Sequence, residues 1–595
     1  MQKLKRETVL ILLGLFLASS LMFSFVQEEP TLGLTDEIKV DQVGYLPSHK
    51  KLAFVTGSTV KPGAKFYVKE ANTGTTVYTG MLSTQSFECT DSGDTIYSAD
   101  FSDLAAPGSY YLEVEGVGRS FNFDIQDNIY NELFYHAMRF FYYQRCGMDL
   151  EAPYAGKWTH KACHLNDAVI HSSAVSEKRP EGTLVSSPGG WHDAGDYGKK
   201  IVNAGITVAT LLRLYEMFPE RVGTINLNIP ESANSMPDIL DEVKYELDWM
   251  LTMQRPDGAV YHNIVTSSFA SMGTAPENDS ATRYFGPVSS CATADFAGAM
   301  AMAARIYENF DPLFAQNCLD AAEKAWEHLE NHPNIFPSGG YTDPEGIHGT
   351  GGYYDTDDSD ERFWAAAELF RTTGKTKYNE YVKANYSRWG GVHYPESWRY
   401  VNNLGMFAYA FATQPEVDVD LQNQIRSSIV DYANSTLSRI TSTGYRVALN
   451  SDDYYWGSNS IAMYFAAGLI IANEIQPKQE FIEGALDQLH YILGRNALNH
   501  SFVTGMGENC TRYPWHTWIC NYPGDPPPGL LSGGPNKYKA PYDKILCEII
   551  DSGAPPAKCY ADNCVIQGTI GTWASNEPCI SYNAPLVFVA GYFLT

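Results

Sequence analysis

Two aspartates lie three residues apart in a glycine-rich segment of the sequence. The segment runs from Gly189 to Gly198 and reads Gly-Gly-Trp-His-Asp-Ala-Gly-Asp-Tyr-Gly, which places the acids at Asp193 and Asp196. Two carboxylates this close can hold a water molecule, and their mutual repulsion keeps one of them effective as a base. The competing interpretation is a turn whose aspartates cap the helix that follows.

A third acid, Glu577, lies near the C-terminus among Trp573, Ile580 and Tyr582. Apolar neighbours raise the pKa of a carboxyl group, which suits a general acid. The competing interpretation is an ordinary surface glutamate beside a proline. Because Asp196 and Glu577 are far apart in the sequence, only the fold can bring them together.

The chain divides into two patterns. Residues 36–126 contain short alternating strands separated by Gly, Pro, Asn and Asp turns, which predicts a small all-β sandwich of immunoglobulin type. Residues 128–595 show apolar positions at helical spacing with no strand pattern between them, which predicts a mainly α domain. The expected helices are 129–145, 201–218, 237–253, 293–308, 313–330, 361–373, 378–386, 404–412, 421–438, 458–474 and 480–493.

The N-terminus and the composition limit the class of protein. Lys3, Lys5 and Arg6 precede an apolar run from Val9 to Val26, so residues 1–30 are predicted to be a signal peptide or an uncleaved membrane anchor. The net charge of −27 argues against nucleic acid as a partner, and the 13% aromatic content suits a neutral sugar ligand. An aromatic core beneath an acidic, solvated surface explains the same numbers.

The sequence contains 11 cysteines, an odd number that cannot pair completely. Export permits disulfides, and the six cysteines near the C-terminus are candidates for local bridges. These are Cys510, Cys520, Cys547, Cys559, Cys564 and Cys579.

The motifs together resemble glycoside hydrolase family 9, the cellulase family whose catalytic domain is an (α/α)6 barrel. The matching segments are GGWHDAGDYGK at 189–199 and NEPCISYNAPLVF at 576–588. The segment VDQVGYLP at 40–47 looks like the immunoglobulin-like module that precedes the barrel in one branch of the family. The resemblance implies an (α/α)6 barrel over residues 128–595 behind an immunoglobulin-like sandwich over 36–126.

The resemblance also implies roles for the acids. Asp196 would be the general base, Asp193 would help to hold the same water, and Glu577 would donate the proton. Tyr582 would lie near the scissile sugar. In an inverting glycosidase the acid and the base are roughly 6.5–9.5 Å apart, which leaves room for the attacking water.

Two segments bear on sugar contact. The family usually has a Pro-His-His-Arg-like segment after a Thr-Gly-x-Gly motif, but here Trp515 and Thr517 replace the first His and the Arg, and only His516 survives. Asp562, in Tyr-Ala-Asp, matches a Tyr-x-Asp that the family carries before the acid, although about six extra residues separate it from Glu577. We expect His516 and Asp562 to bind substrate, with an altered substrate preference.

Two metal sites are predicted. Cys146, Cys163, His164 and His192 offer soft sulfur and nitrogen donors, and the family resemblance implies structural zinc at these positions. For each residue alone, a buried cysteine or a loop histidine is the competing interpretation.

An acidic segment suggests the second metal. The resemblance implies calcium at Thr356, Asp357, Asp360 and Glu361, although a further aspartate expected downstream is Arg399 here. Acidic capping of the helix that begins there explains the same residues.

The sequence therefore predicts a secreted, inverting β-1,4-glucanase that acts on cellulose or related β-glucans, with aromatic side chains stacked on sugar rings. One alternative is an exo-acting relative, such as a cellobiohydrolase, β-glucosidase or exo-glucosaminidase, which the altered segment at Trp515 motivates. The other is a glucan-binding protein that has lost catalysis, against which the three intact carboxylates argue.

Overall fold

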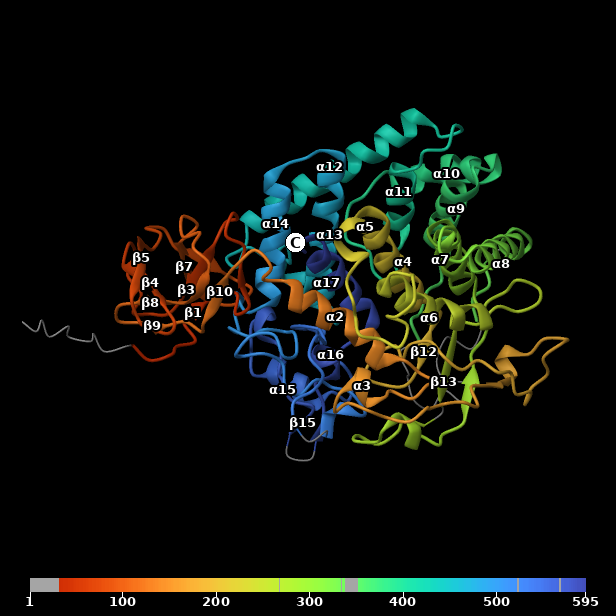
Figure 1. The fold of residues 1–595 in the computed structure, drawn as a ribbon, viewed down its shortest axis with the longest axis horizontal. Helices are drawn as coiled ribbons and strands as arrows, with labels where there is room; N and C mark the ends of the chain where they lie inside the picture. The colour runs from red at the N-terminus through yellow and green to blue at the C-terminus, as the bar shows by residue number, and fades with distance from the viewer. Residues whose placement is uncertain (1–31, 267, 333, 338–351, 522–523, 567–568) are drawn as a thin grey trace, which may run out of the picture.

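A computed structural model describes residues 32–266, 268–332, 334–337, 352–521, 524–566 and 569–595 (Figure 1). A β domain at the N-terminal end lies beside a larger helical region, as the sequence predicts. The predicted signal peptide or anchor over residues 1–30 lies outside the described residues. Within the described ranges, no helix is both long enough and apolar enough to cross a bilayer.

The β domain is built from two sheets that enclose an apolar core. One sheet has the order β1-β3-β7-β6, and the other has the order β2-β10-β8-β4-β5, with β9 paired to β8. Side chains of alternating positions, such as Phe66 and Val68 on β4, point into the core between the sheets. The strands are β1 (Ile38–Lys39), β2 (Gly44–Tyr45), β3 (Leu52–Val55), β4 (Lys65–Glu70), β5 (Thr76–Met81), β6 (Phe87–Cys89), β7 (Asp94–Asp100), β8 (Gly108–Val114), β9 (Gly118–Arg119) and β10 (Phe123–Ile125).

Each predicted helical segment coincides with an observed helix to within a few residues. The sequence reading missed α17 (Ile580–Tyr592), which is apolar on all sides and carries Pro585 in its interior, so it shows neither an amphipathic stripe nor an uninterrupted run. The main helices are α2 (Asn131–Gln144), α4 (Ile201–Met217), α6 (Asp238–Thr252), α7 (Ser290–Tyr307), α8 (Pro312–Asn331), α9 (Ser359–Thr373), α10 (Thr376–Trp389), α11 (Asn402–Ala410), α12 (Val419–Thr441), α13 (Ser458–Ile475), α14 (Gln479–Ile492), α15 (Lys544–Asp551), α16 (Trp573–Asn576) and α17.

The helices pack as an inner set surrounded by an outer set. Helices α4, α7, α9, α11, α13 and α17 are buried over most of their length, and all of them except α9 are apolar on nearly every side. Helix α17 packs between α4 and α13. From α4 the inner set runs on in order, with α4 against α7, α7 against α9, and α9 against α11. The amphipathic helices α2, α6, α8, α10 and α14 each pack mainly against one inner helix, and α12 contacts both α11 and α13.

The helical region also contains a small sheet, which corrects the expectation that no strands occur there. Four short strands have the order β11-β14-β13-β12. They are β11 (Val169–Ile170), β12 (Lys199–Lys200), β13 (Asn263–Thr266) and β14 (Arg283–Phe285). Strands of two to four residues are too short to show a period-2 pattern, so the sequence carries no signal for them. Strand β12 leads directly into α4.

The β domain is joined to the helical region through buried polar contacts. The backbone N–H of Gln42 donates to the Leu493 carbonyl at 2.9 Å, and its side-chain amide donates to the Asn499 carbonyl at 2.9 Å. The Gln42 carbonyl oxygen Oε1 accepts from the Asn509 N–H at 2.8 Å. Asp41 Oδ2 lies 2.7 Å from His490 Nδ1. These contacts fix the β domain to the segment that follows α14.

We expect Gln42→Ala to lower the free energy of unfolding by about 2 kcal/mol, because the Asn509 N–H loses its partner at a buried interface. Thermal unfolding of the purified variant measures this. Gln85→Ala is the matched control, since Gln85 is exposed on the same domain. Equal melting temperatures for the two variants would contradict the role given to Gln42.

Candidate functional site

The glycine-rich loop and the segment of Glu577 meet where two inner helices begin. The loop precedes β12 and α4, and Glu577 lies three residues before α17. The Ile580 N–H donates to the Asp193 carbonyl at 2.9 Å, which places the first turn of α17 against the loop. The positive ends of both helix dipoles therefore lie close to the acids and favour their negative charge.

Asp193 is buried and held on both carboxylate oxygens. Asn203, in the first turn of α4, donates to Oδ1 at 2.7 Å, and the Tyr353 hydroxyl donates to Oδ2 at 2.9 Å. Burial raises the pKa of Asp193, while Lys200, Asn203 and Tyr353 act in the opposite direction. The sequence reading missed Asn203 and Tyr353, because no motif marks a partner that only the fold brings close.

Asp196 is the more open of the two aspartates, with 14% of its side chain exposed. Its Oδ1 accepts from the Gly198 N–H at 2.6 Å, which fixes one oxygen and leaves the other for a water molecule.

Tyr582 lies in the first turn of α17. Its ring packs against Gly457, where an added Cβ would lie 2.9 Å from the ring. The structure thus brings Asp193, Asp196 and the first turn of α17 into one site.

The surroundings of Glu577 favour the protonated form of its carboxyl group. Burial, and then the charge of Asp196, raise the pKa of Glu577 well above its usual range. Its Oε1 accepts from the Gly195 N–H at 3.1 Å. A Cβ added to Gly195 would lie 2.3 Å from the Trp515 carbonyl oxygen, so only glycine permits this approach. A carboxyl that keeps its proton beside a base with access to water can perform acid–base hydrolysis.

Gln144, at the C-terminal end of α2, clamps the loop and was not identified from the sequence. Its side-chain amide donates to the carbonyls of His192 at 3.0 Å and Ala194 at 2.9 Å. Its oxygen faces His516 Nε2 at 3.1 Å. His516 is only 2% exposed, and burial lowers its pKa to about 3, so the ring is neutral and donates to Gln144. In this structure His516 supports the loop through Gln144, and direct sugar contact by His516 stays a prediction.

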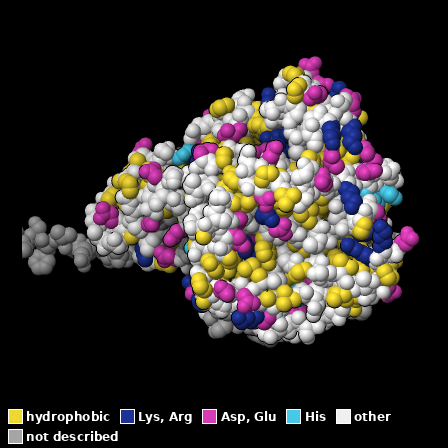
Figure 2. Space-filling model, turned by 45° about the vertical axis from the view of Figure 1, so that its right-hand side comes forward, with side chains coloured by type: hydrophobic (Ala, Val, Ile, Leu, Met, Phe, Trp, Pro, Cys, Tyr) yellow, Lys and Arg dark blue, Asp and Glu magenta, His cyan; other side chains and the backbone are white. Residues whose placement is uncertain are grey.

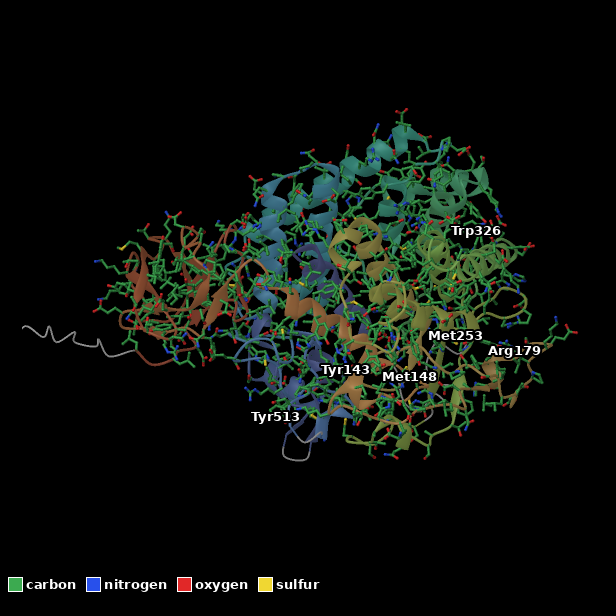
Figure 3. The ribbon with its side chains drawn as sticks, viewed as in Figure 1. Tyr143, Met148, Arg179, Met253, Trp326 and Tyr513 are labelled. Carbon is green, nitrogen blue, oxygen red and sulfur yellow. A yellow bond between two sulfur atoms is a disulfide. The ribbon has the colours of Figure 1, made fainter. Side chains whose placement is uncertain are left out.

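In this structure the carboxylate of Asp562 is hydrogen-bonded to the protein backbone. Its two carboxylate oxygens accept from the backbone N–H groups of Arg512 and Tyr513 at 2.7 and 2.8 Å. Tyr513 lies among the C-terminal loops, coloured blue in Figure 3. A disulfide between Cys520 and Cys564 joins the same two segments. Asp562 and the disulfide thus hold the loop that carries Trp515 and Thr517.

The sequence predicted local bridges among the six cysteines near the C-terminus, and the Cys520–Cys564 disulfide is one such bridge. The other cysteines are free in the structure, including four of the six near the C-terminus. These four are Cys510, Cys547, Cys559 and Cys579.

The loop with Trp515 packs directly on the glycine-rich loop. The Thr517 N–H donates to the Gly195 carbonyl at 2.7 Å, and the Trp515 N–H donates to the Asn576 carbonyl at 3.1 Å. The ring of Trp515 lies edge-on to Trp573, with centroids 6.1 Å apart. The residues that replace the usual His and Arg therefore contact the backbone around both Asp196 and Glu577.

Four side chains beside the loop match a zinc site. A tetrahedral zinc with Zn–S bonds of ~2.3 Å and Zn–N bonds of ~2.05 Å needs ligand edges of roughly 3.8 Å (S–S), 3.6 Å (S–N) and 3.3 Å (N–N). The Sγ atoms of Cys146 and Cys163 are 3.9 Å apart. His164 Nδ1 lies 3.6 Å from Cys146 Sγ and 3.3 Å from His192 Nε2, which lies 3.9 Å from Cys163 Sγ. The far nitrogen of His164 faces Asp279 at 3.3 Å, as expected for a ligating histidine.

The predicted calcium ligands do not assemble in the same way. Among the described residues, the Cys146 group is the one set of three or more His, Cys, Asp or Glu side chains whose ligand atoms lie within 4.8 Å of one another. Asp357 is exposed and pairs with Arg388, whereas Asp360 and Glu361 are buried. Thr356 is exposed as well. Calcium at Thr356, Asp357, Asp360 and Glu361 stays a prediction.

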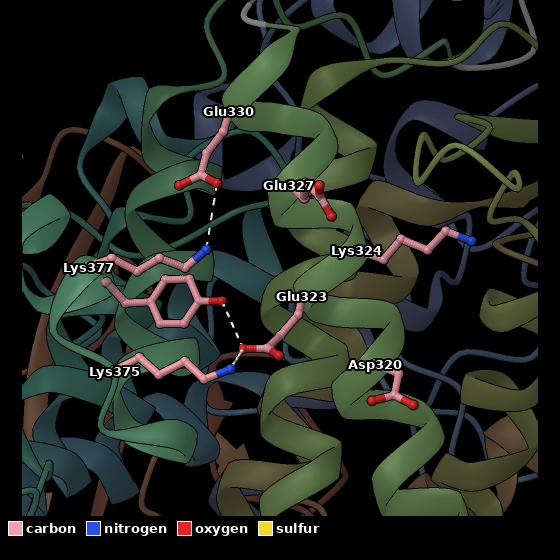
Figure 4. A pocket seen from close by; sticks show the side chains of 8 residues that line it. Asp320, Glu323, Lys324, Glu327, Glu330, Lys375 and Lys377 are labelled. Atoms are coloured by element: carbon pink, nitrogen blue, oxygen red, sulfur yellow. Dashed lines mark hydrogen bonds and ion pairs between the residues drawn. The ribbon is translucent and has the colours of Figure 1, made fainter.

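A surface hollow of about 440 Å³ lies between α8 and α10, away from the acids (Figure 4). Its lining is mostly charged and contains two ion pairs: Lys375 pairs with Glu323, and Lys377 pairs with Glu330. Asp and Glu side chains are scattered over the visible face of the molecule rather than gathered in one patch (Figure 2). Neither feature offers the acid–base chemistry of the loop.

We expect Gly195→Ala to lower kcat by about 100-fold, because a shift of roughly 1 Å at a reacting group has that cost. The new methyl group forces the Trp515 carbonyl and the Glu577 carboxyl apart. Gly189→Ala is the control: its φ of 91° makes alanine strained, but no atom lies within 4 Å of the added Cβ. It should lose stability and keep kcat. Full activity of Gly195→Ala would contradict the close approach.

Comparison with known proteins gives matches over both parts of the chain. A model described as Glycosyl hydrolase family 9 matches residues 130–590, and one described as Cellulase N-terminal ig-like domain matches residues 34–119. The chain is 37% identical over 575 residues to endoglucanase D of Acetivibrio thermocellus, covering 94% of this chain and 83% of that protein.

Two further matches describe related activities and the same architecture. The chain is 33% identical to a cellulose 1,4-beta-cellobiosidase of Acetivibrio thermocellus, covering 93% of this chain and 67% of that protein. The crystal structure of GH family 9 endoglucanase J30 superposes with a TM-score of 0.86 at 37% identity, covering 92% of this chain and 99% of that one.

Proposed function

Because the chain belongs to glycosyl hydrolase family 9, we propose that it is an inverting endo-β-1,4-glucanase acting on cellulose or a related β-glucan. The observation that carries the proposal is the pairing of the buried Glu577, whose pKa is raised, with the more open Asp196 across Gly195. The inner and outer helices support an (α/α)6 barrel as the catalytic domain, with the acids at the ends where α4 and α17 begin.

The proposed reaction uses the two carboxyl groups in different protonation states. Glu577 gives its proton to the oxygen of the leaving sugar, while Asp196 takes a proton from water. The water attacks the anomeric carbon on the face opposite the leaving group, which inverts its configuration. Asp193 and its partners Asn203 and Tyr353 hold the base and its water in place.

An exo-acting enzyme is the second candidate. The altered loop favours it: Trp515 and Thr517 pack against the backbone on both sides of the reacting acids and replace side chains that would contact sugar. One uniform early product from cellulose oligosaccharides would support exo action, whereas a mixture of lengths would support the endoglucanase.

We expect Asp196→Asn and Glu577→Gln each to reduce hydrolysis of a soluble β-glucan by about 100-fold to 10,000-fold, since each removes a proton-transfer group. Glu323→Gln, in the α8–α10 hollow, should remain fully active.

NMR of the wild-type digest should show the α-anomer first. Near-normal activity of either catalytic variant would contradict the assignment, and an initial β-anomer would contradict inversion.

We also propose structural zinc at the Cys146 group. When bound, zinc would crosslink the end of α2 to the residue before Asp193, so its role is to hold the catalytic loop. The four inter-ligand distances carry this proposal. The calcium predicted at Thr356, Asp357, Asp360 and Glu361 is not developed further, because among the described residues their carboxylates form no such group.

We expect one zinc per wild-type chain and almost none in Cys163→Ser, with a lower melting temperature in the variant. Elemental analysis of the dialysed proteins measures the metal. Cys318→Ser is the matched control, since Cys318 is equally buried but lies on α8, outside the group. Equal zinc in Cys163→Ser and the wild type would rule out this site.

Export through residues 1–30 completes the proposal. The basic start and the apolar run support it. N-terminal sequencing of protein recovered outside the cell distinguishes a cleaved signal from a retained anchor.

A further inference from the structure

A buried lysine lies between the two aspartates. The side chain of Lys200 is 2% exposed, and its Nζ lies 3.5 Å from Asp193 Oδ2 and 3.7 Å from Asp196 Oδ1. We propose that Lys200 is a positioning residue for hydrolysis, whose ammonium group holds both carboxylates in one arrangement. The inference rests on the proposed function and adds a component that the motifs do not include.

The position of Lys200 on strand β12 determines the direction in which its side chain points. Successive residues of a strand point to opposite faces, and β12 consists of Lys199 and Lys200. Lys199 points away from the acids: its Nζ donates to the carbonyls of Ser187 and Gly189, each at 3.0 Å, and pairs with Asp167 at 2.9 Å. Lys200 points toward the acids. The two buried lysines therefore have separate tasks.

Gly198 packs directly against the ammonium group. A Cβ added to Gly198 would lie 2.6 Å from Lys200 Nζ and 2.9 Å from Asp196 Oδ1. Glycine at this position lets the ammonium and the carboxylate approach each other beside the backbone. Because Gly198 also donates its N–H to Asp196, that carboxylate is fixed from two sides.

The charge balance of the site depends on Lys200. Burial opposes its charge, but the carboxylates of Asp196 and Asp193 outweigh burial and raise the pKa of the ammonium group. Lys200 in turn opposes the rise in the pKa of Glu577. The titratable and charged groups around Lys200 are Asp193, Asp196, Glu577, Cys579, Tyr353 and His262.

The test compares Lys200→Met with the matched control Lys199→Met over a full pH series on soluble β-glucan. We expect Lys200→Met to lower kcat by about tenfold to 100-fold, with KM within about twofold because the buried lysine does not touch sugar. The alkaline limb of its pH profile should move to higher pH. The reason is that the positive charge of Lys200 lowers the pKa of Glu577, so the pKa rises further when that charge is removed. Lys199→Met should leave that limb in place.

Two further variants separate positioning from folding. Lys200→Arg keeps the charge and should restore the wild-type alkaline limb, and Lys200→Gln provides a second uncharged side chain. Unchanged kcat and pH limb in Lys200→Met, or a raised KM alone, would overturn the inference. So would unfolding of both uncharged variants in circular dichroism. A wild type that hydrolyses no β-glucan would instead contradict the proposed function itself.

Discussion

The site depends on the approach of two segments at Gly195, where the backbone N–H of the loop meets the Glu577 carboxyl at 3.1 Å. This contact couples the acid to the loop that carries Asp196, and it is possible only because residue 195 has no side chain to meet the Trp515 carbonyl. The same approach buries Glu577 and places it close to Asp196, and both effects raise the pKa of Glu577, as a general acid requires.

The loop itself is held from every direction. Gln144 binds its backbone from α2, Asn203 binds Asp193 from α4, and the Ile580 N–H binds the Asp193 carbonyl from α17. The Cys146 group lies at the N-terminal side of the loop, and Thr517 lies against Gly195. A flexible glycine-rich segment thus becomes rigid through its neighbours rather than through its own sequence, which is what precise acid–base geometry requires.

How much the sequence could predict follows from the range of each signal. Asp193, Asp196 and Glu577 stand in segments with distinctive local composition, and the amphipathic helices and β-sandwich strands have regular periods, so these were predictable. Helix α17 was not, because Pro585 and its uniformly apolar surface hide its period. Gln144 and Lys200 were missed because their partners lie in other elements or because a neighbouring lysine looks identical in the sequence. The burial of His516 against Gln144 was not predictable, because similarity to a motif does not reveal which face of a loop is buried.

The contacts of Gln42 limit how far the two domains can be treated as independent modules. The β domain supplies a donor and an acceptor to backbone groups of the segment between α14 and the loop of Trp515. Exchange of this domain for an unrelated sandwich during evolution would leave those backbone groups bare unless the newcomer carried an amide at the same place. The surface of the β domain and the backbone that it covers therefore have to match each other, atom for atom, at this interface.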